Sequence, residues 1–176
     1  MRALALVSVL VLVSACVSQE RKVHSFENQV LLQVSEPLST DVEVIIATPA
    51  DGVYADTPIE LSGSRTASAV RDAFVAKAAN VSIDEGCDSI DCISENFTGD
   101  QGYAVIPIIL HWEERATEWS GVPDQIKVQI DTYDVGSKTL LASFVIRGYG
   151  KQWTYGGEHT QDLLPVPLAE YVAMLY

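Results

Sequence analysis

The segment 111–124 contains most of the side chains in this sequence that could carry out chemistry. Its ionisable members are His111, Glu113, Glu114, Arg115, Glu118 and Asp124. Hydrolysis of a glycosidic bond needs two carboxylates about 5 to 9 Å apart, one with a raised pKa, and Glu114 and Glu118 could adopt that spacing. The sequence places neither of them in a cleft, and Arg115 or Arg147 would pair with them as readily. A hydrolase is therefore the alternative interpretation, and no catalytic residue is assigned.

A metal site in this segment would need His111 with Glu113 or Glu114, joined by His159 from later in the chain. The H-E-x-x-H pattern of zinc enzymes is absent, and a single histidine beside carboxylates is typical of a hydrogen-bonded structural group. We therefore expect neither a metal site nor a cofactor.

Aromatic side chains favour recognition over chemistry. The chain has three tryptophans; two lie in the segment 111–124, and the third lies with Tyr155 in the glycine-rich stretch 148–162. Flat amphipathic rings beside carboxylates suit the binding of a sugar or a peptide. An equally good interpretation is a small aromatic core that joins the two loops, with Arg115 in buried ion pairs. The candidate binding residues are His111, Trp112, Glu114, Arg115, Glu118, Trp119, Trp153, Tyr155 and His159.

The hydrophobic pattern predicts the elements that position these residues. Strands are expected at 42–48, 81–83, 103–110, 125–133 and 140–147, with the last two forming an antiparallel hairpin. Ser64 is expected to cap a helix over 65–79, and a second helix follows Pro165. Pro107 cannot donate to a ladder, so its strand lies at an edge or bends there. The order predicts a single-domain α/β sandwich with a mixed sheet of about five strands, a helix after the first strand and a C-terminal helix packed on the sheet.

Composition narrows the range of partners. A chain of 176 residues is long enough for one domain with a proper core, and a formal net charge of −13 repels nucleic acid.

Cys87 and Cys92 form an even pair that predicts one disulfide closing a short loop in an oxidising compartment. A metal site at these cysteines would need two further ligands, and no histidine or cysteine lies near them in the sequence.

The N-terminus indicates export. Met1-Arg2 followed by an apolar run too short to span a bilayer is typical of a signal peptide. The run ends in Val13-Ser-Ala-Cys16, which resembles a bacterial lipobox, so residues 1–15 are expected to be removed and Cys16 to carry the lipid. Val17 is not the aspartate that retains lipoproteins at the inner membrane in enterobacteria-like sorting, which favours the outer membrane facing the periplasm. Residues 16–40 are expected to form the lipidated tether and 41–176 the α/β domain.

Several short patterns give the chain a family resemblance. They are Pro49-x-Asp-Gly52-x-Tyr54, Ser62-Gly63, Ala73-Phe74, Tyr103-x-x-x-Pro107, HWEERATEWSG at 111–121 and Asp162-Leu-Leu-Pro165. Together they resemble a family of proteobacterial lipoproteins carrying a domain of unknown function. The resemblance implies lipidation, an envelope location and one domain, and it adds no catalytic residue.

A more distant similarity concerns the fold. A strand ending in a polar loop, a hairpin around Asp134-Val-Gly136 and a closing helix are similar to the α/β domains of the curli-secretion lipoprotein and of penicillin-binding-protein activator lipoproteins. This similarity implies a binding or assembly module, although a fold alone does not define a function. We therefore expect a non-enzymatic lipoprotein whose partners are the membrane, through its lipid, and an envelope protein or glycan, with a periplasmic glycan-processing hydrolase using Glu114 and Glu118 as the alternative.

Overall fold

The protein folds as a mixed α/β domain built on one large sheet. The structure is a computed structural model that describes residues 24–115, 122–151 and 159–176. Its elements in chain order are β1 (Ser25–Phe26), β2 (Gln29–Leu32), β3 (Glu43–Ala47), β4 (Val53–Tyr54), β5 (Thr57–Pro58), α1 (Ser62–Phe74), β6 (Val81–Asp84), α2 (Ile90–Asn96), β7 (Gly102–Glu113), β8 (Gln125–Asp134), β9 (Leu140–Tyr149), the 3-10 helix η1 (Thr160–Leu163) and α4 (Pro165–Leu175).

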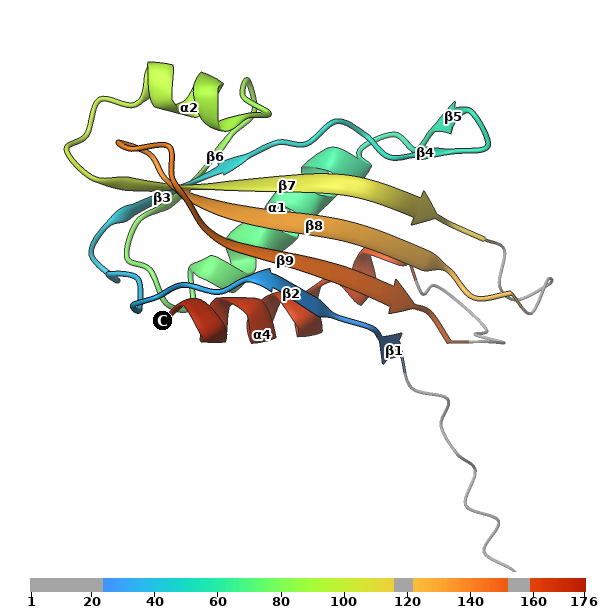
Figure 1. The fold of residues 1–176 in the computed structure, drawn as a ribbon. Helices are drawn as coiled ribbons and strands as arrows, with labels where there is room; N and C mark the ends of the chain where they lie inside the picture. Colours follow the sequence, from blue (N-terminus) through green and yellow to red (C-terminus); the bar gives the residue numbers. More distant parts are fainter. Residues whose placement is uncertain (1–23, 116–121, 152–158) are drawn as a thin grey trace, which may run out of the picture.

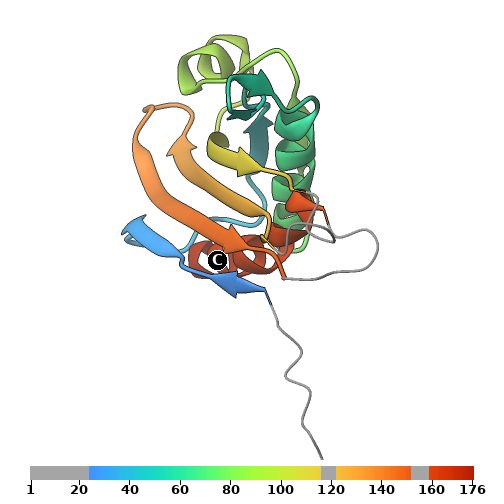
Figure 2. The same cartoon turned by 90° about the vertical axis from the view of Figure 1, so that its right-hand side faces the viewer.

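The main sheet combines a parallel and an antiparallel part. Its order is β1-β9-β8-β7-β3-β6, and β2 also pairs with β9. Strand β3 runs parallel to β6 and β7, whereas β7, β8 and β9 form a long antiparallel meander (Figure 1). The sheet curls around α1 and α4, which lie against one of its faces (Figure 2). The predicted mixed sheet, hairpin and C-terminal helix are therefore confirmed.

The sheet is larger than the sequence predicted. It has seven strands rather than about five, because β1 and β2 come from residues 16–40, the segment interpreted as a tether. Both strands pair antiparallel with β9, with Ser25 opposite Tyr149 and Gln29 opposite Val145. They are short, and β2 is exposed along its whole length, so neither shows the hydrophobic alternation that reveals a strand in a sequence.

Two hydrophobic clusters occupy the two faces of the sheet. The larger one lies beneath α1 and α4, where Phe144 stacks on Tyr171 with ring centroids 5.2 Å apart and the Tyr171 hydroxyl is 2.6 Å from Thr132 Oγ1. The smaller one lies beneath α2 and includes Ile93 and Ile106. The disulfide between Cys87 and Cys92 joins the start of α2 to the loop before it. The remainder of this second face has no helix over it in the part of the chain that the structure describes.

Helix α1 starts and ends earlier than predicted. It runs from Ser62 to Phe74, and Ser64 is not its cap. The residue before the helix, Leu61, is left-handed with φ of 66°, and the side chain of Asp51 accepts hydrogen bonds from the backbone N–H groups of Leu61 at 3.1 Å and Gly63 at 2.7 Å. Only glycine fits at 63, since an added Cβ would lie 2.1 Å from the Pro49 carbonyl oxygen.

Strand β7 changes character along its length, and this change positions the candidate site. Its ladder with β3 ends at Val105, so Pro107 lies where only β8 pairs with the strand. The edge location predicted for Pro107 is thus confirmed for this half of β7. A register shift between Ile109 and His111 then reverses which face of the sheet each successive side chain of β7 points to.

Among the described residues, no helix is long and apolar enough to cross a membrane.

Candidate functional site

The carboxylate of Glu113, at the end of β7, is the centre of a cluster of polar side chains. Its side chain is only 5% exposed, yet three groups surround it. The Arg115 guanidinium bonds to Oε1, and His111 Nε2 lies 3.2 Å from Oε2. Arg115 also donates to the Tyr54 hydroxyl at 3.1 Å. We call Tyr54, His111, Glu113 and Arg115 the Glu113 cluster.

The electrostatics of the Glu113 cluster keep its carboxylate charged. Burial alone would raise the pKa of Glu113, but hydrogen bonds from Tyr54, His111 and Arg115 together lower it below the usual value. The hydrogen bond between Tyr54 and Glu113 raises the pKa of the Tyr54 hydroxyl, and burial of the hydroxyl raises it further. Near neutral pH Glu113 is thus an ionised acceptor, and Tyr54 keeps its proton as a donor.

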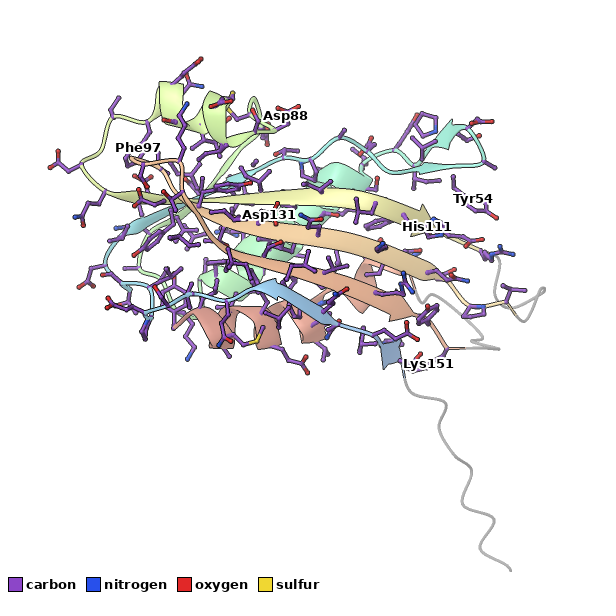
Figure 3. All side chains as sticks on the ribbon, viewed as in Figure 1. Tyr54, Asp88, Phe97, His111, Asp131 and Lys151 are labelled. Carbon is purple, nitrogen blue, oxygen red and sulfur yellow. A yellow bond between two sulfur atoms is a disulfide. The ribbon has the colours of Figure 1, made fainter. Side chains whose placement is uncertain are left out.

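Tyr54 joins the β4–β5 hairpin to the end of β7. Its ring meets His111 edge-on at 6.3 Å between centroids, and the Arg115 guanidinium carbon lies 5.8 Å from the centre of the Tyr54 ring. Figure 3 shows Tyr54 and His111 close together where β4 and β7 end. Tyr54 was not among the predicted binding residues. Its only sequence signal was its place in the Pro49-x-Asp-Gly52-x-Tyr54 pattern.

Asp124, directly before β8, holds the chain where the connection from β7 ends. Its side chain is buried, and Oδ1 accepts a hydrogen bond from the backbone N–H of Arg115 at 2.6 Å. Its carbonyl oxygen accepts another from the N–H of Gly150 at 2.8 Å. Asp124 therefore ties the ends of β7 and β9 to the start of β8, so that Arg115 is held by its backbone as well as by its side chain.

Glu114 and His159 form a second contact between the two regions that the sequence singled out. His159 Nδ1 lies 3.2 Å from Glu114 Oε1, and both side chains are partly exposed. Next to them, the buried Thr160 hydroxyl donates to the carbonyl oxygen of Glu113 at 3.4 Å. His111, Glu114, Arg115 and His159 are therefore brought to one end of the sheet.

Trp112 does not belong to the surface. Its side chain is completely buried in the larger core, so it has no area to offer a partner. The cause is the register shift before His111: continued alternation from Ile109 would have placed Trp112 on the uncovered face, and the shift turns it inward. Gly52 lies directly against it, since a Cβ at this position would be 2.7 Å from Trp112 Cβ.

Four predicted binding residues lie outside the described residues: Glu118, Trp119, Trp153 and Tyr155. The predicted lipidation site Cys16 also lies outside them. Within the ranges that the structure describes, no three His, Cys, Asp or Glu side chains converge to hold a metal ion.

A separate groove of about 710 Å³ lies between α1 and α4, away from the Glu113 cluster. Small and polar side chains line most of it, among them Ser68, Ala73 and Ala169. It contains none of the residues that the sequence singled out for binding.

The fold is similar to those of two solved bacterial proteins. The structure of a PelC dodecamer from Paraburkholderia phytofirmans superimposes with a TM-score of 0.62 at 13% identity, covering 87% of this chain and 97% of that one. A DUF330 family protein from Xanthomonas campestris gives a TM-score of 0.50 at 13% identity, covering 81% and 90%. At such low identity the similarity concerns the fold alone. A comparison with curated protein sequences gives no match.

Sequence comparison with family models is more specific. One family, described as a domain of unknown function, matches residues 36–175 and therefore nearly all of the folded part of the chain. Its match includes every residue of the Glu113 cluster. The chain belongs to the DUF4823 family.

Proposed function

We propose that this chain is an outer-membrane lipoprotein, anchored through Cys16 and facing the periplasm, whose domain binds or assembles with a partner in the cell envelope. The surface proposed to meet the partner is made by Tyr54, His111 and Arg115. The observation that carries the proposal is the state of Glu113: its carboxylate is ionised and already occupied by three donors. It acts as a support for the residues around it.

The exposed members of the Glu113 cluster suit recognition. The Arg115 side chain is 34% exposed and the His111 side chain 41% exposed, while both are held from below by the buried Glu113 carboxylate. Arginine and tyrosine are the residue types that most often dominate binding energy at interfaces. Because hydrogen bonds already fix these side chains, little conformational entropy is lost when a partner binds.

Hydrolysis has no comparable support among the described residues. A general acid in glycoside hydrolysis needs a raised pKa, whereas the pKa of Glu113 is lowered. Glu114, the acid named in the alternative interpretation, pairs with His159 on the outside of the domain. Glu118, its companion, lies outside the described residues.

An assembly role is supported by the fold comparison. The PelC protein with the similar fold was solved as a dodecamer, so this architecture is compatible with a ring or another multi-copy assembly. A partner of this chain can therefore be another envelope component or further copies of the chain itself.

Site-specific crosslinking in living cells tests the proposal. A photoreactive residue is placed at Val53, which is 55% exposed and adjoins Tyr54, and as a matched control at Ser68 on α1. We expect a discrete crosslinked product from Val53 and none of the same size from Ser68. Equal products from both positions, or none from Val53, would contradict the proposed surface. In parallel, turnover of peptidoglycan fragments that disappears in a folded Glu114→Gln variant would support the hydrolase instead.

A further inference from the structure

Three basic side chains lie in one row across the uncovered face of the sheet. His111 on β7 is opposite Lys127 on β8, and Lys127 is opposite Arg147 on β9. Their neighbours Ile126, Val128 and Ile146 point into the core beneath α1 and α4, so the three basic residues point to the other face. We call His111, Lys127 and Arg147 the basic row. Neighbouring strands are about 4.8 Å apart, so the row spans about 10 Å.

Such a row is unexpected in this chain. The sequence has 11 lysines and arginines against 24 aspartates and glutamates, so three basic residues side by side stand out from the acidic average of the chain. Nothing in the fold requires them there, because polar neutral residues would satisfy a solvent-facing strand equally well.

His111 already contacts the Glu113 carboxylate at 3.2 Å, whereas the other two side chains of the basic row have few partners. Among the described residues, the Lys127 side chain has no hydrogen-bond or ion-pair partner, although its backbone lies in the ladder of the sheet. Arg147 has one partner, Glu27, at 3.5 Å, and both side chains are well exposed, so solvent weakens that pair. Asp131, a further buried carboxylate on the same face, is engaged by the Ser143 hydroxyl at 2.5 Å.

Two adjoining hollows flank the basic row, with volumes of about 370 and 340 Å³. Lys127 and Arg147 line both of them, so the two hollows form one shallow surface on either side of these side chains. Their other walls are mostly amide, carboxylate and phenol groups, namely Glu27, Asn28, Gln29, Gln125 and Tyr149. The surface is therefore long, polar and rich in hydrogen-bonding groups.

We infer that the basic row binds an anionic glycan, a chain of sugars bearing carboxylates. Lys127 and Arg147 supply ion pairs to successive carboxylates, and the amides and Tyr149 supply hydrogen bonds to hydroxyls. The inference rests on the proposed binding function and names a ligand class for a second surface of the same domain, which adjoins the Glu113 cluster through His111.

Peptide and phosphate fit this surface less well. A peptide that binds a sheet pairs with a free strand edge or fills apolar pockets, whereas β8 is hydrogen-bonded on both sides and, because Ile126 points into the core, only Val145 adds an aliphatic side chain to the hollows. A compact phosphate needs donors that converge on one point, often from free backbone N–H groups. The basic row is linear, and an elongated ligand with several charges matches it better.

Titration of the full-length chain in detergent tests this inference. The ligand is a short oligogalacturonate, and the comparison ligands are a neutral oligogalactoside, tetraglutamate and inorganic pyrophosphate. We expect binding of the oligogalacturonate that weakens with added salt, and about a tenfold loss of affinity in the double variant Lys127→Gln/Arg147→Gln. The control double variant Arg71→Gln/Lys138→Gln makes the same charge change elsewhere on the surface and should alter affinity less than about twofold.

A gain of affinity provides a second readout. Glu27→Gln removes the only described carboxylate paired with Arg147, so this variant should bind the oligogalacturonate more tightly than the unmodified chain. No binding of oligogalacturonate, equal binding in the Lys127→Gln/Arg147→Gln variant, or tighter binding of tetraglutamate or pyrophosphate would overturn the inference. If one of these outcomes is found and the Val53 crosslink still forms, the glycan site is refuted while the proposed partner surface stands.

Discussion

Glu113 and Arg115 lie two residues apart and form an ion pair whose acidic half is buried and whose basic half reaches solvent. The pair forms on the uncovered side of the sheet because the register shift after Ile109 turns Glu113 to that side. A buried acceptor beneath an exposed donor fixes the donor in place. This arrangement is the structural basis for interpreting the end of β7 as a recognition surface.

Removing the charge of Glu113 should destabilise the fold. Glu113→Gln leaves the Arg115 guanidinium and the Tyr54 hydroxyl with a weaker acceptor, and we expect a loss of about 1 to 2 kcal/mol, because one third of Arg115 is exposed and solvent screens part of the interaction. The free energy of unfolding in urea measures it. The exposed pair Lys138–Asp91 is the matched control, and Lys138→Gln should cost less than about 0.5 kcal/mol. Equal losses in both variants would contradict the special role of Glu113.

The ion pair should also shape the response to acid. The pKa of Glu113 is lowered in the folded protein from its ordinary value of 4.5, so its contribution to stability is complete above that value and disappears as the pH falls through the folded pKa. The difference in unfolding free energy between the unmodified chain and Glu113→Gln should therefore be constant from pH 7 to about 5 and shrink below about 4.5. Chemical denaturation at a series of pH values measures this difference. A difference that grows on acidification would be inconsistent with a lowered pKa.

Gly52 should tolerate no side chain. In Gly52→Ala the new methyl group would lie 2.7 Å from Trp112 Cβ and 2.9 Å from Ile109 Cγ2, next to atoms fixed by the backbone of β7. Relief of this overlap should cost about 1 to 3 kcal/mol and displace the hairpin that carries Tyr54. Thermal unfolding measures the loss. Gly136→Ala serves as the control because its new methyl group would lie 3.6 Å from the nearest atom, Asp134 Oδ1, and a melting temperature lowered equally in both variants would refute this prediction.

The anchor is predicted to depend on one sulfur atom. Cys16→Ser should abolish incorporation of an alkyne-labelled fatty acid and release the chain from the membrane fraction, because several acyl chains on the cysteine provide the proposed attachment. Fractionation of cells and detection of the label measure both effects. The Cys92→Ser variant controls for loss of a cysteine elsewhere and should remain labelled. Label retained on the Cys16→Ser protein would disprove lipidation at this residue.

Local patterns predicted the fold well. The alternation from Gln125 to Tyr133 predicts β8, and the apolar spacing after Pro165 predicts α4, because both signals depend on neighbours within the same element. The start of α1 could not be predicted, since its N–H groups are capped by Asp51, which lies 10 to 12 residues earlier and outside the local pattern of a helix cap. The short strands β1 and β2 form only because β9 offers them an edge.

The candidate site was predicted less completely. The sequence identified His111, Arg115 and Glu114, since unusual residue types cluster there, and the structure brings them together with His159. It could not reveal that Trp112 is a core residue, because one register shift decides which side of β7 it occupies. Contacts between distant segments, such as Tyr54 with Arg115, leave no local pattern.

The proposed recognition surface is tested most directly through Arg115. The measurement is the yield of the product crosslinked from the photoreactive residue at Val53, compared between the unmodified chain, Arg115→Ala and the exposed control Arg71→Ala, with circular dichroism confirming that each protein is folded. We expect a yield reduced at least about tenfold in Arg115→Ala and unchanged in Arg71→Ala. A folded Arg115→Ala protein that captures its partner as well as the unmodified chain does would rule out Arg115 as part of the proposed surface.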